Sequence, residues 1–93
     1  MHALLFYDYV QDMLERRVPW RDAHFAWVKG FVDRGELLLG GAFTDPADGA
    51  VIAFRVRDLA QVEAFARGDP YVVQGLVTAW RIREWNAVVG SAL

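Results

Sequence analysis

The sequence predicts an α+β protein whose elements follow the order β-α-β-β-α-β. Four short runs of apolar and aromatic residues are typical of strands, and two longer segments carry the periodicity or the end signals of helices. The chain has 93 residues, which is the length of one domain, and no repeat or linker divides it. We therefore expect residues 1–93 to form one domain built on a four-stranded antiparallel sheet.

The first part of the chain predicts a strand and then an amphipathic helix. Residues 3–10 (ALLFYDYV) suit a strand, and the polar segment 11–18 contains a short helical turn. Pro19 suits the first position of a helix and Gly35 suits its end. Between them, residues at helical spacing share one apolar face: Trp20, Ala23, His24, Trp27, Val28 and Phe31.

The second part predicts a hairpin, a helix, a helical turn and a last strand. Residues 36–43 and 50–56 flank a Pro/Asp/Gly turn, which indicates a hairpin. Asp58 and Gln61 form a capping-box pattern that begins a helix ending at Gly68. A single helical turn follows from Asp69, and residues 77–85 (VTAWRIREW) suit the fourth strand. This is the split βαβ order of ferredoxin-like folds, with the strand order 4-1-3-2 and both helices on one face.

The predicted sheet carries large apolar side chains on both faces. In the first strand Leu4 and Phe6 alternate with Leu5 and Tyr7. Two helices cover only one face, and a chain of this size buries only about 60–65% of its unfolded surface. An exposed apolar face usually marks an interface. We therefore expect a homodimer packed sheet to sheet.

Composition excludes several classes of function. Hydrophobic residues make up 55% of the chain and the net charge is −2, which argues against disorder and against nucleic-acid binding. No apolar run approaches the length that crosses a membrane, and no secretory signal pattern is present, so we expect a cytoplasmic protein. With no cysteine and two histidines, the chain lacks thiol chemistry and a three-histidine metal site. If the protein is an enzyme, its chemistry is expected to be acid–base or electrostatic, carried by His24 and carboxylates.

Two residues have both a structural and a functional interpretation. His24 lies within the apolar stripe between Trp20 and Trp27, where it is either a core histidine bonded to a carbonyl or a proton shuttle. Asp69 precedes Pro70, which is typical of an N-cap. The two roles of Asp69 are compatible, because one carboxylate oxygen can cap the turn while the other orients His24.

The arginines also have two interpretations. Arg55 and Arg81, on the third and fourth strands, are expected to face Tyr7 or Tyr9 and to bind an anion, or else to join an ion-pair network at the dimer interface. The basic run of Arg16, Arg17 and Arg21 is interpreted as a solvated face. Four further aromatic residues are interpreted as core or interface residues in preference to a ligand cage: Phe54, Tyr71, Trp80 and Trp85.

Several pieces of the sequence, taken in order, are similar to one known family. They are residues 21–25 (RDAHF), 35–42 (GELLLGGA), 69–71 (DPY), 75–77 (GLV) and Trp85. Together they resemble the YCII-related family, over nearly the whole chain. Phe25 departs from the leucine that is more frequent there. The resemblance implies a dimeric α+β-barrel fold with a pocket between helix and sheet.

The resemblance also implies an active site formed by a histidine and an aspartate, which are His24 and Asp69 here. It suggests elimination or isomerisation on small oxygenated ring compounds. The first hypothesis is therefore a lyase or isomerase that needs no cofactor and no metal, with a pocket lined by Trp20, Trp27 and Phe54 and an arginine for the substrate. The second is a non-catalytic module for small-molecule binding or oligomerisation.

Overall fold

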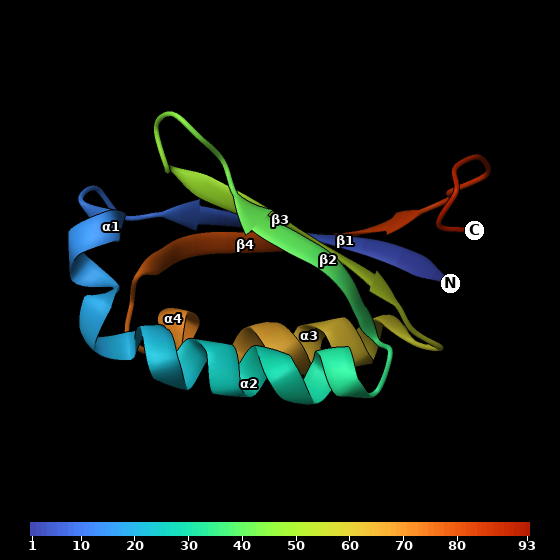
Figure 1. Ribbon diagram of the computed structural model, residues 1–93, viewed down its shortest axis with the longest axis horizontal. Helices are drawn as coiled ribbons and strands as arrows, with labels where there is room; N and C mark the ends of the chain where they lie inside the picture. Colours follow the sequence, from blue (N-terminus) through green and yellow to red (C-terminus); the bar gives the residue numbers. More distant parts are fainter.

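A four-stranded sheet lies over a layer of helices in the computed structural model of the protein, which describes residues 1–93 (Figure 1). The longest helix has 13 residues, and no helix has the length and apolar character needed to cross a membrane. In chain order the elements are β1 (His2–Tyr9), α1 (Met13–Arg16), a 3-10 turn η1 (Val18–Trp20), α2 (Arg21–Asp33), β2 (Leu37–Ala42), β3 (Gly49–Arg55), α3 (Leu59–Gly68), α4 (Pro70–Val73) and β4 (Val77–Trp85).

The sheet is antiparallel throughout, with the strand order β2-β3-β1-β4. This is the predicted order 4-1-3-2 read from the other edge, so the predicted ferredoxin-like topology is confirmed. β1 lies in the interior of the sheet, where Tyr7 stands opposite Ala50 of β3 and Trp80 of β4. A side chain from the inner face of β1 is therefore enclosed by strands on both sides.

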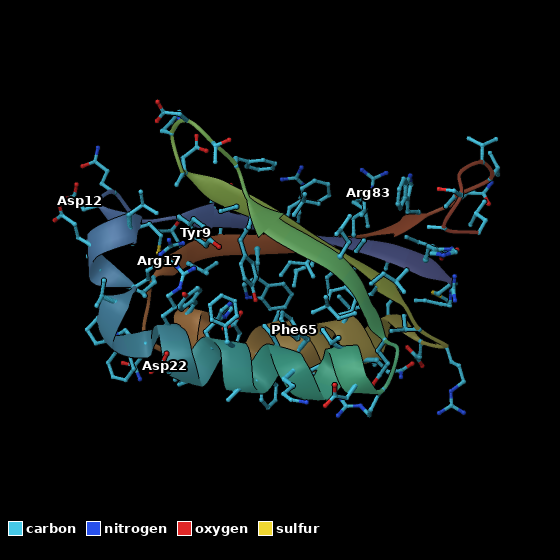
Figure 2. The ribbon with its side chains drawn as sticks, viewed as in Figure 1. Tyr9, Asp12, Arg17, Asp22, Phe65 and Arg83 are labelled. Carbon is cyan, nitrogen blue, oxygen red and sulfur yellow. The ribbon has the colours of Figure 1, made fainter.

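The core lies between the sheet and helices α2, α3 and α4, which cover the same face, while α1 lies at one end of the sheet (Figure 1). On β1, Ala3, Leu5 and Tyr7 are buried, while the residues between them are more exposed. Phe65 of α3 packs edge-on against Phe54 of β3, with ring centroids 5.2 Å apart. Figure 2 shows Phe65 between the layers.

Helix α2 begins two residues later than Pro19. Pro19 lies within the 3-10 turn, and Trp20 is the N-cap of α2. Because a 3-10 turn has three residues per turn instead of 3.6, it rotates Trp20 away from the apolar stripe. Trp20 is 37% exposed and Ala23 is also exposed, so the stripe that packs inward begins at His24.

The predicted capping signals are confirmed. Asp58 accepts a hydrogen bond from the Ala60 backbone N–H, and Gln61 reaches back to the Asp58 backbone N–H. Helix α3 then ends at Gly68, and Asp69 begins the turn α4 by accepting from the Tyr71 backbone N–H. Gly75 ends the turn at a φ of 74°, in the left-handed region that favours glycine.

Helices α2 and α3 are in contact at Trp27 and Gly68. The indole Nε1 of Trp27 donates a hydrogen bond of 3.0 Å to the carbonyl oxygen of Phe65. A Cβ atom on Gly68 would overlap the indole ring of Trp27. His24 lies three residues before Trp27 and Asp69 directly follows Gly68, so this contact sets the distance between His24 and Asp69.

The outer face of the sheet is apolar at its centre, as predicted. Leu4 and Phe6 of β1 alternate with the buried residues and stand opposite Ala53 and Val51 of β3. No helix covers this face, which also carries Arg83 (Figures 1 and 2). The contents of the two faces thus differ, with the core on one side and an uncovered apolar strip on the other.

We expect Gly68→Ala to lower the free energy of unfolding by about 1–3 kcal/mol, because the new methyl group overpacks the contact with Trp27. The matched control is Gly30→Ala in α2, where a Cβ meets only the flexible end of Arg34. That change should raise stability by about 1 kcal/mol through helix propensity. Chemical denaturation of both variants measures the difference. Equal stability of the two variants would contradict the packing argument.

Candidate active site

The site is organised around the carboxylate of Asp69, which is fully buried. Its Oδ1 accepts from the backbone N–H of Tyr71 at 3.0 Å and lies 2.7 Å from Nδ1 of His24. Its Oδ2 accepts from the hydroxyl of Tyr7 at 2.8 Å. A buried carboxylate needs such donors to replace its hydration. Both predicted roles of Asp69 are therefore present in its geometry, the helix cap and the partner of His24.

His24 projects from the first turns of α2 onto this carboxylate, with 12% of its side chain exposed. An ionised Asp69 is only an acceptor, so Nδ1 carries the proton and the neutral ring has its lone pair on Nε2. Nε2 has no hydrogen-bond partner in the protein, and no buried polar side-chain atom lacks a partner, so Nε2 is open to solvent. The imidazole also stacks on Tyr71, with centroids 3.8 Å apart and planes 5° apart.

The tyrosines around the site are held in their neutral form. Burial, and then the negative charge of Asp69, raise the pKa of Tyr7 far above its usual range. Burial also raises the pKa of Tyr9 to about 12 and raises the pKa of Tyr71. Tyr7 therefore remains a hydrogen-bond donor to Asp69 at any physiological pH, and the hydroxyl of Tyr9 keeps its proton as well.

A cavity of about 430 Å³ opens beside His24, between α2 and the inner face of β1, β2 and β3. Its volume is in the range of ligand pockets. Among the inward positions of β2 and β3 beside the cavity, Ala42 and Ala50 are small and leave space unfilled, whereas Gly40 lies against the side chain of Ile52. The lining is mostly apolar, and its polar groups are contributed by Tyr7, Tyr9, Arg17, Arg21, His24 and Tyr71.

The structure brings together three of the residues singled out from the sequence: His24, Asp69 and Tyr7. The aromatic residues expected to line the pocket lie elsewhere. Trp20 is in the 3-10 turn, Trp27 faces α3, and Phe54 is fully buried against Phe65. None of these three lines the cavity.

Arg55 and Arg81 also lie away from the cavity, on the outer face of the sheet. Arg55 stands opposite His2, and Arg81 stands opposite Phe6 with its guanidinium 4.5 Å from the centre of that ring. Successive side chains of a strand point to opposite faces. Phe6 and Tyr7 are neighbours, so an arginine beside Phe6 cannot share the face of Tyr7.

Sequence reasoning did not assign four polar residues that line the cavity to the site: Tyr9, Tyr71, Arg17 and Arg21. Tyr71 follows the capping Asp69 by two residues, and that spacing in a helical turn was a usable signal for its place beside the carboxylate. The arginines gave only the signal of a basic run, which does not reveal which side chains turn inward. No group of three or more histidine and carboxylate side chains is arranged to hold a metal ion.

We expect the three tyrosines to resist ionisation until the protein unfolds. Their pKa values are raised in the folded state, so this contribution to stability is complete below the ordinary value of about 10 and is lost as the pH rises above it. A spectrophotometric titration of phenolate should show one cooperative step that coincides with loss of circular dichroism. A phenolate signal near pH 10 in the folded protein would contradict this.

Comparison with known proteins assigns the chain to a family. The family model of the YCII-related domain matches residues 1–86. Among solved structures, 5-chloro-2-hydroxyhydroquinone dehydrochlorinase (TftG) from Burkholderia phenoliruptrix, in complex with 2,5-dihydroxybenzoquinone, superposes with a TM-score of 0.77. The identity is 20%, over 92% of this chain and 94% of that chain, which shows a shared fold. None of the curated proteins matches the chain significantly. Since the family model spans nearly all of the sequence, the protein belongs to the YCII-related family.

Proposed function

We propose that the protein is a small lyase or isomerase that uses His24, positioned by Asp69, for acid–base chemistry on a small oxygenated ring compound. The observation that carries the proposal is the state of the imidazole. One ring nitrogen is bound to a buried carboxylate, and the other is free and solvent-accessible on a residue that lines the cavity. A general base needs this combination of fixed orientation and one open lone pair.

The surrounding groups position His24, and two of them, Tyr7 and Tyr71, also border the cavity. Asp69 fixes the Nδ1–H tautomer, and the stacked ring of Tyr71 fixes the plane of the imidazole. Tyr7 and the Tyr71 backbone hold the carboxylate. His24 is therefore the catalytic residue of the proposal, and the other three are positioning residues.

The chemistry follows from one proton transfer. Nε2 of His24 removes a proton from a hydroxyl group, or from a ring carbon next to a carbonyl, of the bound compound. In an elimination, the electron pair released in this way forms a new double bond and expels a leaving group with its bonding electrons. In an isomerisation, the imidazolium returns the proton to a different ring atom. Asp69 stabilises the imidazolium in both cases.

The second hypothesis, a non-catalytic binding module, uses the same cavity without the proton transfer. The similarity to a dehydrochlorinase supports the enzyme as the first choice, together with the ordered imidazole. A buried carboxylate that serves binding alone has no need of a histidine with one nitrogen left open. The cytoplasmic location expected from composition stays a prediction.

We expect His24→Asn to lower kcat by about 10²–10⁴-fold, the usual contribution of a general base. Asp69→Asn should lower kcat with a smaller change in KM, because the amide no longer selects the Nδ1–H tautomer. The compounds to be tested as substrates are chlorinated and unchlorinated hydroxyhydroquinones and hydroxybenzoquinones. Chloride release reports elimination, and proton–deuterium exchange at ring carbons, followed by NMR, reports proton transfer without product formation.

Each variant has a matched control within the chain. His2→Asn changes the only other histidine, and Asp58→Asn changes the other helix-capping aspartate, where asparagine caps equally well. Both controls should keep wild-type kcat. Ring compounds that bind to the wild type with neither chloride release nor exchange would favour the binding module. Exchange that persists in His24→Asn would rule out His24 as the base.

The uncovered apolar strip on the sheet supports a further part of the proposal, assembly as a homodimer through this face. Leu4, Phe6, Val51 and Ala53 lie together on it, and Trp85 at the end of β4 is 48% exposed. A stable interface of this kind buries more than about 1,000 Å² in total. A second copy of the same face supplies an apolar surface of matching shape.

We expect sedimentation at micromolar concentration to give a dimer for the wild type and a monomer for Phe6→Arg, because the new charge must be desolvated at the centre of the interface. Leu14→Arg is the control, since Leu14 is an exposed apolar residue on α1, away from the sheet. It should leave the dimer intact. A folded wild-type monomer at that concentration would contradict the assembly.

A further inference from the structure

The permanently charged side chains that line the cavity are all positive. The chain contains twelve aspartates and glutamates and has a net charge of −2. No carboxylate is among the residues that line the cavity, whereas two arginines, Arg17 and Arg21, are. Asp69 lies beneath the lining and is fully buried, with its two oxygens engaged by Tyr7, His24 and the Tyr71 backbone. The open space therefore borders on positive charge.

These two guanidinium groups also lack partners within the protein. Lys29, Arg34 and Arg67 each pair with a nearby carboxylate. Arg17 and Arg21 form no salt bridge, and neither donates a side-chain hydrogen bond within the protein, although both are half-buried. A guanidinium has five donors and normally finds acceptors when it leaves the surface. No donor is buried without a partner, so the free donors are open to solvent.

The two arginines are held near the tyrosines that border the cavity. The guanidinium of Arg21 lies 5.0 Å from the centre of the Phe25 ring, a contact that positions it without neutralising its charge. Figure 2 shows Arg17 and Tyr9 at the same end of the molecule, between the helices and the sheet. The carboxylates nearest in sequence, Glu15 and Asp22, are exposed, and Figure 2 shows Asp22 at the outer edge.

Tyr9 adds a neutral donor to this group. Burial raises the pKa of Tyr9 to about 12, although the charge of Arg17 acts in the opposite direction. The hydroxyl therefore keeps its proton at neutral pH, and it forms no hydrogen bond within the protein. Tyr9 belongs to the inner face of β1, as Tyr7 does, so its ring stands on the same side of the sheet as the site.

We propose that Arg17 and Arg21, with the hydroxyl of Tyr9, form an anion-binding subsite beside His24, and that the ligand of the cavity is a one-ring compound carrying a carboxylate or an ionised enol. The anion-binding subsite defines the substrate class of the proposed active site, and its catalytic role rests on the proposed function. The apolar lining from Phe25, Val28 and β2 accommodates the ring, and the arginines bind its charged oxygens.

The subsite also has a consequence for the chemistry. Removal of a proton by Nε2 of His24 leaves negative charge on the oxygens of the substrate ring. Fixed positive groups that lie where this charge develops lower the barrier, because they need no reorganisation at the moment of reaction. The same arginines that select an ionised ligand therefore stabilise its transition state.

The test compares charged ligands with neutral analogues by calorimetry. Hydroxybenzoates are paired with their amides, and hydroxybenzoquinones with their methyl ethers. We expect the wild type to bind the anion of each pair at least about 10-fold more tightly, with a preference that weakens as salt is added. Arg17→Gln and Arg21→Gln should each weaken anion binding by about 10- to 100-fold and leave the neutral analogue nearly unchanged. Tyr9→Phe should cause a smaller loss of the same kind.

Arg16→Gln is the matched control, because Arg16 is an exposed arginine next to Arg17 that does not line the cavity. It should bind every ligand as the wild type does, and melting curves of all variants confirm that they are folded. The subsite is ruled out if no anion binds, if neutral analogues bind equally well, or if a double variant with both Arg17→Gln and Arg21→Gln keeps the preference. His24→Asn separates this inference from the proposed function: it should keep the anion preference and lose turnover. A preference without any turnover in the wild type supports the subsite and contradicts the enzyme.

Discussion

The burial of one carboxylate is the constraint on which the rest of the structure depends. Asp69 has no contact with solvent, and an ionised group in that position is stable only if its donors are held in place. Those donors come from separate parts of the chain: Tyr7 from β1, His24 from α2, and the Tyr71 backbone from α4. The central strand and two helical elements therefore converge on one residue, and the requirement for partners keeps them together.

The same residue joins local structure to chemistry. As the cap of α4, Asp69 has the extended backbone that precedes a helix, and its Oδ1 is turned toward the Tyr71 N–H. This direction also presents Oδ1 to Nδ1 of His24. The contact of Trp27 with Gly68, the residue before Asp69, fixes α2 against α3. A histidine is thereby held in one tautomer by the packing that stabilises the fold, and its other nitrogen is free to react.

The sheet divides the functions of the molecule between its two faces. On the inner face, large side chains fill the core at Phe54 and Phe65, and small ones leave a cavity at Ala42 and Ala50. On the outer face the apolar residues have no cover within the chain. The arginines are divided between the faces as well: Arg17, which precedes the 3-10 turn, and Arg21 of α2 line the cavity, and the arginines of β3 and β4 do not.

The sequence by itself determined the order of the elements, the caps of α3 and α4 and the strand order. Periodicity and capping depend on residues a few positions apart, and such signals are complete within a short segment. The family resemblance supplied the expectation that two residues 45 positions apart meet, and the structure places them in contact. Only the tertiary structure decided which other side chains surround the site. A shift of one residue along a strand moves a side chain to the opposite face of the sheet. Arg81 stands opposite Phe6 and not Tyr7, so it lies on the face away from the site. A 3-10 turn ahead of α2 turned Trp20 outward, while Arg17 and Arg21 lined the cavity. The backbone path through such a turn depends on what it packs against. The directions of the side chains around it therefore follow from the assembled layers and not from the local sequence.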